Sequence, residues 1–180
     1  MPGPCDTSSM SATASLVKRL EDGRDAFLAL APRVEAGRPW PLSDAFGVEP
    51  ESHWGPPEVL AHVAEMLPFW LGEIARVLDG PDEPDEPVPF GRVASNELRI
   101  GVIGRDRTLP PIELFERVDA GAERFGRFLR ELAEEDGARR GVHPTLGEMD
   151  VLAIAERFVV VHLEEHVQRL GELVDRRASD

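Results

Sequence analysis

Four stretches of the chain carry apolar residues at helical spacing, and no stretch alternates convincingly between apolar and polar side chains as a half-buried strand would. We therefore predict helices over residues 11–36, 56–78, 110–135 and 148–177. In a chain of 180 residues, four helices of this length predict an all-α fold, a four-helix bundle. The clearest pattern advances in steps of three and four through Phe115, Val118, Ala122, Phe125, Leu129 and Leu132.

Prolines and polar residues indicate where these helices begin, bend or lose regularity. Pro32 weakens the last turn of the first helix, and Pro68 should kink the second helix in its middle. Thr145 with Glu148 resembles a capping box ahead of the fourth helix, and Asp150 is a competing cap. The second helix is apolar on every side, which predicts that it is largely buried.

Residues 79–108 separate the second helix from the third, and a connection of this length is unusual in a compact domain. Residues 79–89 form an acidic, proline-rich run that cannot be helical, whereas residues 91–104 leave open a short helix or an extended piece. We interpret the segment as a long crossover between helices 2 and 3, which lets these two helices run parallel.

The net charge of −14 restricts the partners of the chain. Such a protein repels phosphate backbones and anionic membrane surfaces, so we expect neither nucleic acid nor a membrane as partner. No apolar run approaches the roughly 20 residues that span a bilayer.

The beginning of the chain differs in composition from the rest. We expect residues 1–10 to be a disordered leader, and residues 11–178 to form a single domain. The leader lacks the charged-then-apolar order of a signal peptide, which predicts a cytoplasmic protein. Cys5 is the one cysteine, so an intramolecular disulfide is excluded, and we interpret Cys5 as an incidental residue of the leader.

Three histidines form the candidate chemical centre. His162 and His166 stand four apart on the predicted last helix, which places both imidazoles on one face, within reach of one metal ion. His62 lies on an apolar face of the second helix, where a buried imidazole needs a partner. Together they would form a three-histidine site with open positions, which suits Zn²⁺ best and also admits Ni²⁺, Fe²⁺ or Mn²⁺. Spacing alone leaves equally open that all three are hydrogen-bonded core or surface residues.

Four other polar residues are weaker candidates. His53 and His143 fall in predicted loops, and we interpret them as surface residues or residues at the rim of a site. Glu65 and Glu73 lie near the face of His62 and could orient an imidazole by accepting a hydrogen bond from the ring nitrogen that does not bind the metal. For these two glutamates we favour the alternative of solvated or paired helix charge.

Aromatic and acidic residues near the histidines admit structural interpretations as well. Trp54, Phe69 and Trp70 either wall a pocket at the metal end or belong to the core. Glu164 and Glu165 lie between the paired histidines but point to other faces, so we expect them on the surface.

The crossover also carries three arginines, Arg92, Arg99 and Arg105, which could meet an anionic substrate. The sequence contains no glycine-rich phosphate loop, no serine elbow and no Cys/His pair placed for nucleophilic catalysis. Beyond the three histidines, it therefore identifies no catalytic residue.

The chain resembles the DinB superfamily, which includes the YfiT-like metal-dependent hydrolases and bacterial thiol S-transferases. One motif corresponds to the family's tryptophan, helix start and first metal histidine, the next to the lead-in to its last helix, and the third to its last-helix histidine pair. The resemblance spans nearly the whole chain in helix order, the long crossover included. The stretches that carry it are WGPPEVLAHV (54–63), HPTLGEM (143–149) and HLEEHVQRL (162–170).

The resemblance implies a bundle with the metal at one end, held by His62, His162 and His166. It also implies a homodimer and a small-molecule substrate. Some members use a low-molecular-weight thiol such as bacillithiol, mycothiol or glutathione, and one branch isomerises maleylpyruvate. No thiol-binding motif of the family maps onto this sequence residue by residue.

Two functions compete at this point. In the first, a divalent ion on the three histidines would bind water or a thiol, lower its pKa and present it as a nucleophile, as in a hydrolase or a thiol S-transferase. In the second, the chain is a non-catalytic dimeric bundle that binds a metal or another ligand. The absence of an identifiable general base favours this second function. A weaker third interpretation makes the histidines purely structural and predicts no bound metal.

Overall fold

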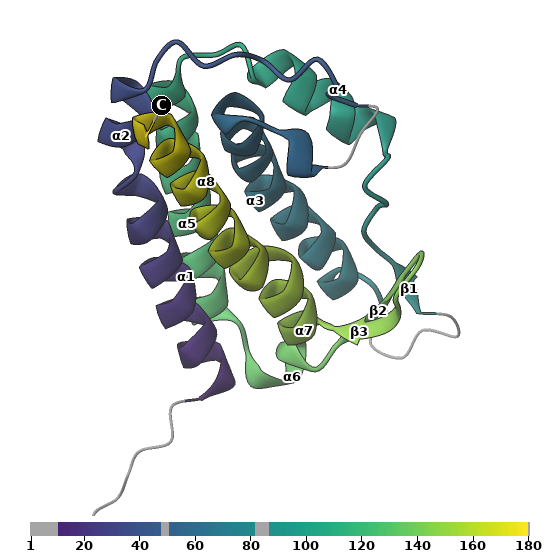
Figure 1. The fold of residues 1–180 in the computed structure, drawn as a ribbon. Coiled ribbons are helices and arrows are strands. Elements are labelled where there is room, and N and C mark those ends of the chain that lie inside the picture. Colours follow the sequence, from purple (N-terminus) through teal and green to yellow (C-terminus); the bar gives the residue numbers. More distant parts are fainter. Residues whose placement is uncertain (1–10, 48–50, 82–86, 180) are drawn as a thin grey trace, which may run out of the picture.

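The computed structural model describes residues 11–47, 51–81 and 87–179, and four long helices dominate it (Figure 1). The helices α1 and α3 each pack on both α5 and α8, so the four surround one core. The predicted all-α four-helix bundle is therefore confirmed, whereas the predicted leader, with Cys5, lies outside the described residues. The long helices are α1 (Ala12–Leu28), α3 (Pro56–Leu78), α5 (Pro111–Glu131) and α8 (His162–Ser179).

The connection between α3 and α5 is the predicted long crossover. It contains strand β1 (Val88–Pro89) and helix α4 (Glu97–Asp106), so it holds both an extended piece and a short helix. Figure 1 shows α4 at the end of the bundle where α3 begins, and α3 and α5 running in the same direction away from it. The chain thus crosses the length of the bundle between these two helices, as the sequence predicted.

Two prolines lie in the helices where the sequence predicted irregularity. The helix α1 ends at Leu28, and the short helix α2 (Ala31–Ala36) follows with Pro32 in its first turn, which confirms the irregular end of the first predicted helix. In contrast, α3 is a single helix that includes Pro68, and the kink expected there stays a prediction.

The sequence did not predict the small three-stranded sheet. Strand β2 (Arg140–His143) pairs parallel with β1 and antiparallel with β3 (Gly147–Asp150). These strands are too short for an alternating pattern to be recognised, and the pairing of β1 with β2 depends on segments far apart in the chain. Gly141 permits the close approach, because a Cβ there would lie 2.7 Å from the Phe90 ring and 2.9 Å from the Val88 carbonyl oxygen.

The third and fourth predicted helices are shorter than expected. The third was expected to reach residue 135, but α5 ends at Glu131 and a separate short helix, α6 (Glu134–Gly137), follows. The fourth was expected from residue 148 and begins instead with α7 (Val151–Ala155). The capping box of Thr145 and Glu148 is therefore wrong, since Glu148 lies in β3.

Asp150 is the N-cap of α7, where the fourth predicted helix begins. This confirms the second of the two caps that the sequence offered. Its Oδ1 accepts the backbone N–H of Ala153 at 2.7 Å. Beyond α7 the backbone widens into a π-helical segment, η2 (Glu156–Val161), and α8 begins directly after it. A π turn contains more residues than an α turn and is frequent at functional sites. It changes the rotation of His162 relative to α7, and no pattern in the sequence indicates it.

The helix α3 is largely buried, as its apolar pattern predicted, and it also buries a charge in its first turn. Glu58 has no exposed surface. Its carboxylate accepts the backbone N–H groups of Ser43 at 2.8 Å and Gly55 at 3.1 Å, and it pairs with Arg107 at 2.9 Å. In the described part of the chain, no helix is long and apolar enough to cross a membrane.

Candidate metal centre

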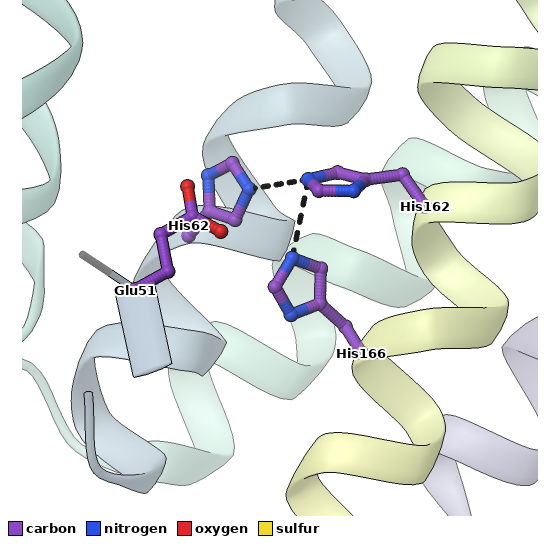
Figure 2. Close-up of side chains that lie close together, drawn as sticks. All are labelled: Glu51, His62, His162 and His166. Carbon is purple, nitrogen blue, oxygen red and sulfur yellow. Dashed lines mark hydrogen bonds between the residues drawn. The ribbon is translucent and has the colours of Figure 1, made fainter. Parts of the chain in front are cut away.

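Figure 2 shows that His62 on α3 meets His162 and His166 on α8. The Nε2 atoms of His62 and His162 lie 2.9 Å apart, and those of His166 and His162 lie 3.2 Å apart. The structure therefore brings together the three residues that the sequence singled out.

Local helix geometry and one packing contact produce this meeting. His162 and His166 are four residues apart on α8, so their rings stack on one face with centroids 4.5 Å apart. Because α3 packs against α8, the His62 ring comes within 5.2 Å and 4.9 Å of the His162 and His166 centroids. The Trp54 ring also contacts His62, edge-on, with ring centroids 5.5 Å apart.

Burial keeps two of these imidazoles neutral. His62 is 3% exposed, and desolvation, followed by the neighbouring His166 and Arg99, lowers its pKa well below the usual value. His166 is 6% exposed, and desolvation and the nearby His162 lower its pKa to about 3. Neutral imidazoles are the form in which histidine binds metals.

The spacing of the nitrogen atoms fits a metal ion. Four ligands at 2.0–2.1 Å in a tetrahedron lie about 3.3 Å from one another. The two Nε2 separations are slightly shorter than this, so a small outward movement of the rings would admit an ion. Glu51 adds a carboxylate oxygen, and one ligand atom from each of the four residues lies within 4.8 Å of all the others. The donor set of three imidazoles and one carboxylate suits Zn²⁺ and other first-row divalent ions.

Glu51 is the residue of this cluster that the sequence did not indicate. It lies in η1 (Glu51–His53), a single 3₁₀ turn in the connection ahead of α3. An ion pair with Arg99 of α4 holds its carboxylate. No periodicity extends into such a loop, so only its position three residues before Trp54 could have drawn attention to it.

The far nitrogen of each imidazole has a different environment. His162 Nδ1 lies 3.1 Å from the Glu165 carboxylate, an arrangement that holds the proton on Nδ1 and leaves Nε2 free to bind a metal. His62 Nδ1 lies 3.5 Å from a guanidinium nitrogen of Arg99, too long a contact to fix the tautomer of the ring. His166 Nδ1 is buried and forms no hydrogen bond with the described residues.

A pocket of about 280 Å³ opens beside this cluster. His62, His162 and Glu51 border it at the cluster, and Arg92 and Arg99 line it from the crossover. A second wall is aromatic, since the Phe158 ring stacks at 4.1 Å on Trp70 and at 5.2 Å on His143, and all three line the pocket. The pocket therefore combines possible metal ligands, cations and an apolar wall.

A larger hollow of about 680 Å³ lies elsewhere, between α1, α5 and α6. Val17, Leu129 and Leu152 are among the residues that line it, and no histidine is. Size alone would favour this hollow, but chemically versatile side chains converge on the smaller pocket.

Three of the weaker candidates pair with residues outside the histidine cluster: Glu65, Glu73 and Arg105. Glu65 pairs with Arg92, and Glu73 accepts the backbone N–H of Gly91 and pairs with Arg76. Neither contacts an imidazole, so their interpretation as paired helix charge is confirmed. Arg105 binds Asp106 on α4 and lies away from the pocket.

Two loop and helix residues lie closer to the site than expected. His143 is 5% exposed and lines the pocket, so its interpretation as a rim residue holds and that as a surface residue is wrong. Desolvation lowers the pKa of its imidazole, whose Nδ1 accepts the backbone N–H of Thr145 at 3.3 Å. Glu165 is exposed, as expected, yet its carboxylate turns back to His162; Glu164 pairs with Arg19 instead.

The remaining candidates are aromatic residues and a histidine. Trp70 lines the pocket, and Trp54 packs on His62, so both are buried core residues that also border the site. Phe69 lies under the guanidinium of Arg92, 3.6 Å from it. His53 is exposed and is not part of the cluster.

A family model described as the DinB superfamily matches residues 10–170 of the chain. Among solved structures, the chain is similar to YfiT from Bacillus subtilis, described as a probable metal-dependent hydrolase with an unusual four-helix bundle topology. The two share 19% sequence identity with a TM-score of 0.67, over 98% of this chain and 94% of that chain. At this identity the likeness shows the fold alone. No curated protein matches the chain.

Proposed function

The chain belongs to the DinB superfamily, and from this premise we propose that it is a divalent-metal-dependent hydrolase whose metal is held by His62, His162 and His166. One observation carries the proposal: at the edge of a pocket, the Nε2 atom of His162 lies within hydrogen-bonding distance of the Nε2 atoms of both His62 and His166. A divalent ion bound there would supply Lewis acidity, which lowers the pKa of a water or thiol that it binds.

The side chains of the chain supply the rest of the site. Glu165 orients His162, and Trp54 packs against the His62 ring and shields it from water. Glu51 borders the pocket, and its carboxylate serves either as a fourth donor or as acceptor of the proton that an entering water or thiol releases. The aromatic wall of Trp70 and Phe158 holds the apolar part of a small substrate.

Zn²⁺ is the preferred ion, because three imidazoles with one open or carboxylate position is a common catalytic arrangement for zinc. Ni²⁺, Fe²⁺ and Mn²⁺ suit the same donors. Transfer of a low-molecular-weight thiol is a second chemistry that such an ion would support, since it activates a thiol as it activates water. The thiol partner, the homodimer and the cytoplasmic location stay predictions from the sequence.

Elemental analysis of protein purified without a metal-affinity tag tests the proposal. We expect about one equivalent of a divalent metal per chain, and its loss in His162→Ala. His53→Ala is the matched control, because it removes an exposed histidine outside the cluster and should leave the metal content unchanged. Hydrolysis of activated esters and amides, and transfer of thiols to electrophiles, should then fall together with the metal.

The competing interpretation, a non-catalytic metal- or ligand-binding bundle, makes a different prediction. It expects metal in the wild-type protein but no turnover of ester, amide or thiol substrates above the level of His162→Ala. Absence of metal, with no uptake of added Zn²⁺ or Ni²⁺, would exclude the proposed function and leave the histidines as structural residues.

A further inference from the structure

Cations gather at the pocket beside the histidine cluster, although the chain as a whole carries a net charge of −14. Arg92 and Arg99 come from the crossover and line the pocket. Arg157 follows from η2, with its guanidinium 6.0 Å from the centroid of the Phe158 ring that lines the same pocket. Glu51 and Glu65 pair with the two lining arginines and offset their charges, so the binding of an anion here depends on guanidinium donors that these pairs leave unused.

The two lining arginines differ in how many of their donors are used. Arg99 donates Nη1 to the Ala94 carbonyl at 3.0 Å and pairs with Glu51 through Nη2, so its guanidinium is held in place. Arg92 uses Nη2 alone, which bonds both carboxylate oxygens of Glu65 at 2.5 Å. With the residues that the structure describes, its Nη1 and Nε form no hydrogen bond. Arg92 therefore keeps donors for a ligand.

The position of Arg92 is fixed, which is what a recognition residue requires. Its side chain is only 12% exposed, and it is held between the Glu65 carboxylate and the face of the Phe69 ring. An arginine that is already ordered loses little conformational entropy when it binds a ligand. Arg157 is exposed and pairs with no acidic residue in the described part of the chain, so it adds a second positive charge near the Phe158 wall of the pocket.

We propose that this pocket binds a small carboxylate, with the anionic group on Arg92 and the carbon body against Trp70 and Phe158. Because Nη2 of Arg92 is bound to Glu65, a carboxylate oxygen would accept a charge-assisted hydrogen bond from Nε or Nη1. The aromatic wall favours an organic acid over inorganic phosphate, which has no apolar body. The volume of about 280 Å³ suits a small metabolite rather than a polymer. That the carboxylate is the substrate of a metal enzyme rests on the proposed function, whereas its binding to Arg92 does not.

Isothermal titration of the full-length protein with benzoate and benzamide tests the inference. The two probes match in size and shape and differ in charge, so the ratio of their affinities reports recognition of the carboxylate. We expect benzoate to bind metal-free protein at least tenfold more tightly than benzamide. Inorganic phosphate should compete with benzoate only weakly.

The variant must remove the guanidinium without leaving the Glu65 charge buried and unpaired, so Arg92→Gln is combined with Glu65→Gln. This double variant should lose the preference for benzoate while melting within a few degrees of the wild type. Arg92→Lys should keep part of the preference, because it retains the positive charge but loses the fixed Nε and Nη1 donors. Arg105→Gln, an exposed arginine of α4 away from the pocket, is the matched control and should bind benzoate as the wild type does.

Several results would overturn the inference while leaving the metal site intact. Equal binding of benzoate and benzamide, an unchanged preference in the folded double variant, or displacement of benzoate by equimolar phosphate would each do so. Binding of benzoate only to Zn²⁺-loaded protein, unaffected by the double variant, would assign the carboxylate to the metal instead. Conversely, benzoate binding that depends on Arg92 in a protein that takes up no metal would sustain the inference and refute the proposed function.

Discussion

Glu58 and His62 are both buried on α3, one helical turn apart, and their surroundings are opposite in character. Glu58 is surrounded by donors: two backbone N–H groups and the guanidinium of Arg107. His62 faces two other imidazoles and Arg99, and the carboxylate of the cluster, Glu51, is already paired with that arginine. The first group is complete within the protein, whereas the second becomes complete only when a cation joins it.

The difference teaches how a buried polar group can be assigned to structure or to function. A buried carboxylate with three donors joins the loop at Ser43 to α3 and to Arg107 at the end of α4, and its removal would leave the Arg107 guanidinium without its counter-charge. Buried imidazoles whose nitrogen atoms face one another gain little from the contact, and their depressed pKa values keep them uncharged. Such a cluster contributes little to folding, so ligand binding is the better explanation for it.

The largest effect that separates the two clusters is expected from Glu58→Ala. The change leaves Arg107 partly buried without its partner and two N–H groups without an acceptor, so we expect a loss of about 3–5 kcal/mol in the free energy of unfolding. Urea denaturation of metal-free protein measures it. Asp22→Ala, which breaks an exposed ion pair with Lys18, is the control and should cost less than about 1 kcal/mol. Similar losses in both variants would remove the distinction.

A smaller effect, on metal affinity rather than on folding, is expected from Glu165→Ala. Loss of the carboxylate behind His162 should weaken Zn²⁺ binding about 10–100-fold, as removal of an outer hydrogen-bond partner does at other histidine sites. Competition with a chromophoric chelator gives the affinity. Glu164→Ala is matched in charge and position but removes a partner of Arg19, and it should bind Zn²⁺ unchanged. If both variants lost affinity equally, general electrostatics would account for the effect.

The smallest effect should come from His166→Leu in the absence of metal. The Nδ1 of His166 is buried without a described partner, and its Nε2 contacts His162, whose Nδ1 keeps the Glu165 carboxylate. An apolar side chain of similar size should therefore change the free energy of unfolding by less than about 1 kcal/mol. Added Zn²⁺ should raise the melting temperature of the wild type but not that of the variant, because only binding to the folded state stabilises it. A loss of several kcal/mol without metal would show that the histidines are part of the structural core.

Local sequence patterns were sufficient for the helices and for part of the site. The four long helices follow from apolar spacing, and the shared face of His162 and His166 follows from their separation of four residues. The sequence was wrong where structure depends on distant pairing. The cap at Thr145 and Glu148 is a case in point, because Glu148 pairs opposite Val142 in a sheet that also recruits β1 from the crossover.

The sequence by itself determined the helical bundle, its family, and three inward-facing histidines, because periodicity constrains side-chain direction within a helix. Only the tertiary structure decided which loop residues lie at the histidine cluster and its pocket. Glu51 reaches the cluster from a 3₁₀ turn, Arg92 arrives from the crossover, and His143 is buried by the sheet. Loop backbones follow no repeating pattern, so the positions of these side chains depend on the packing of elements far apart in the chain.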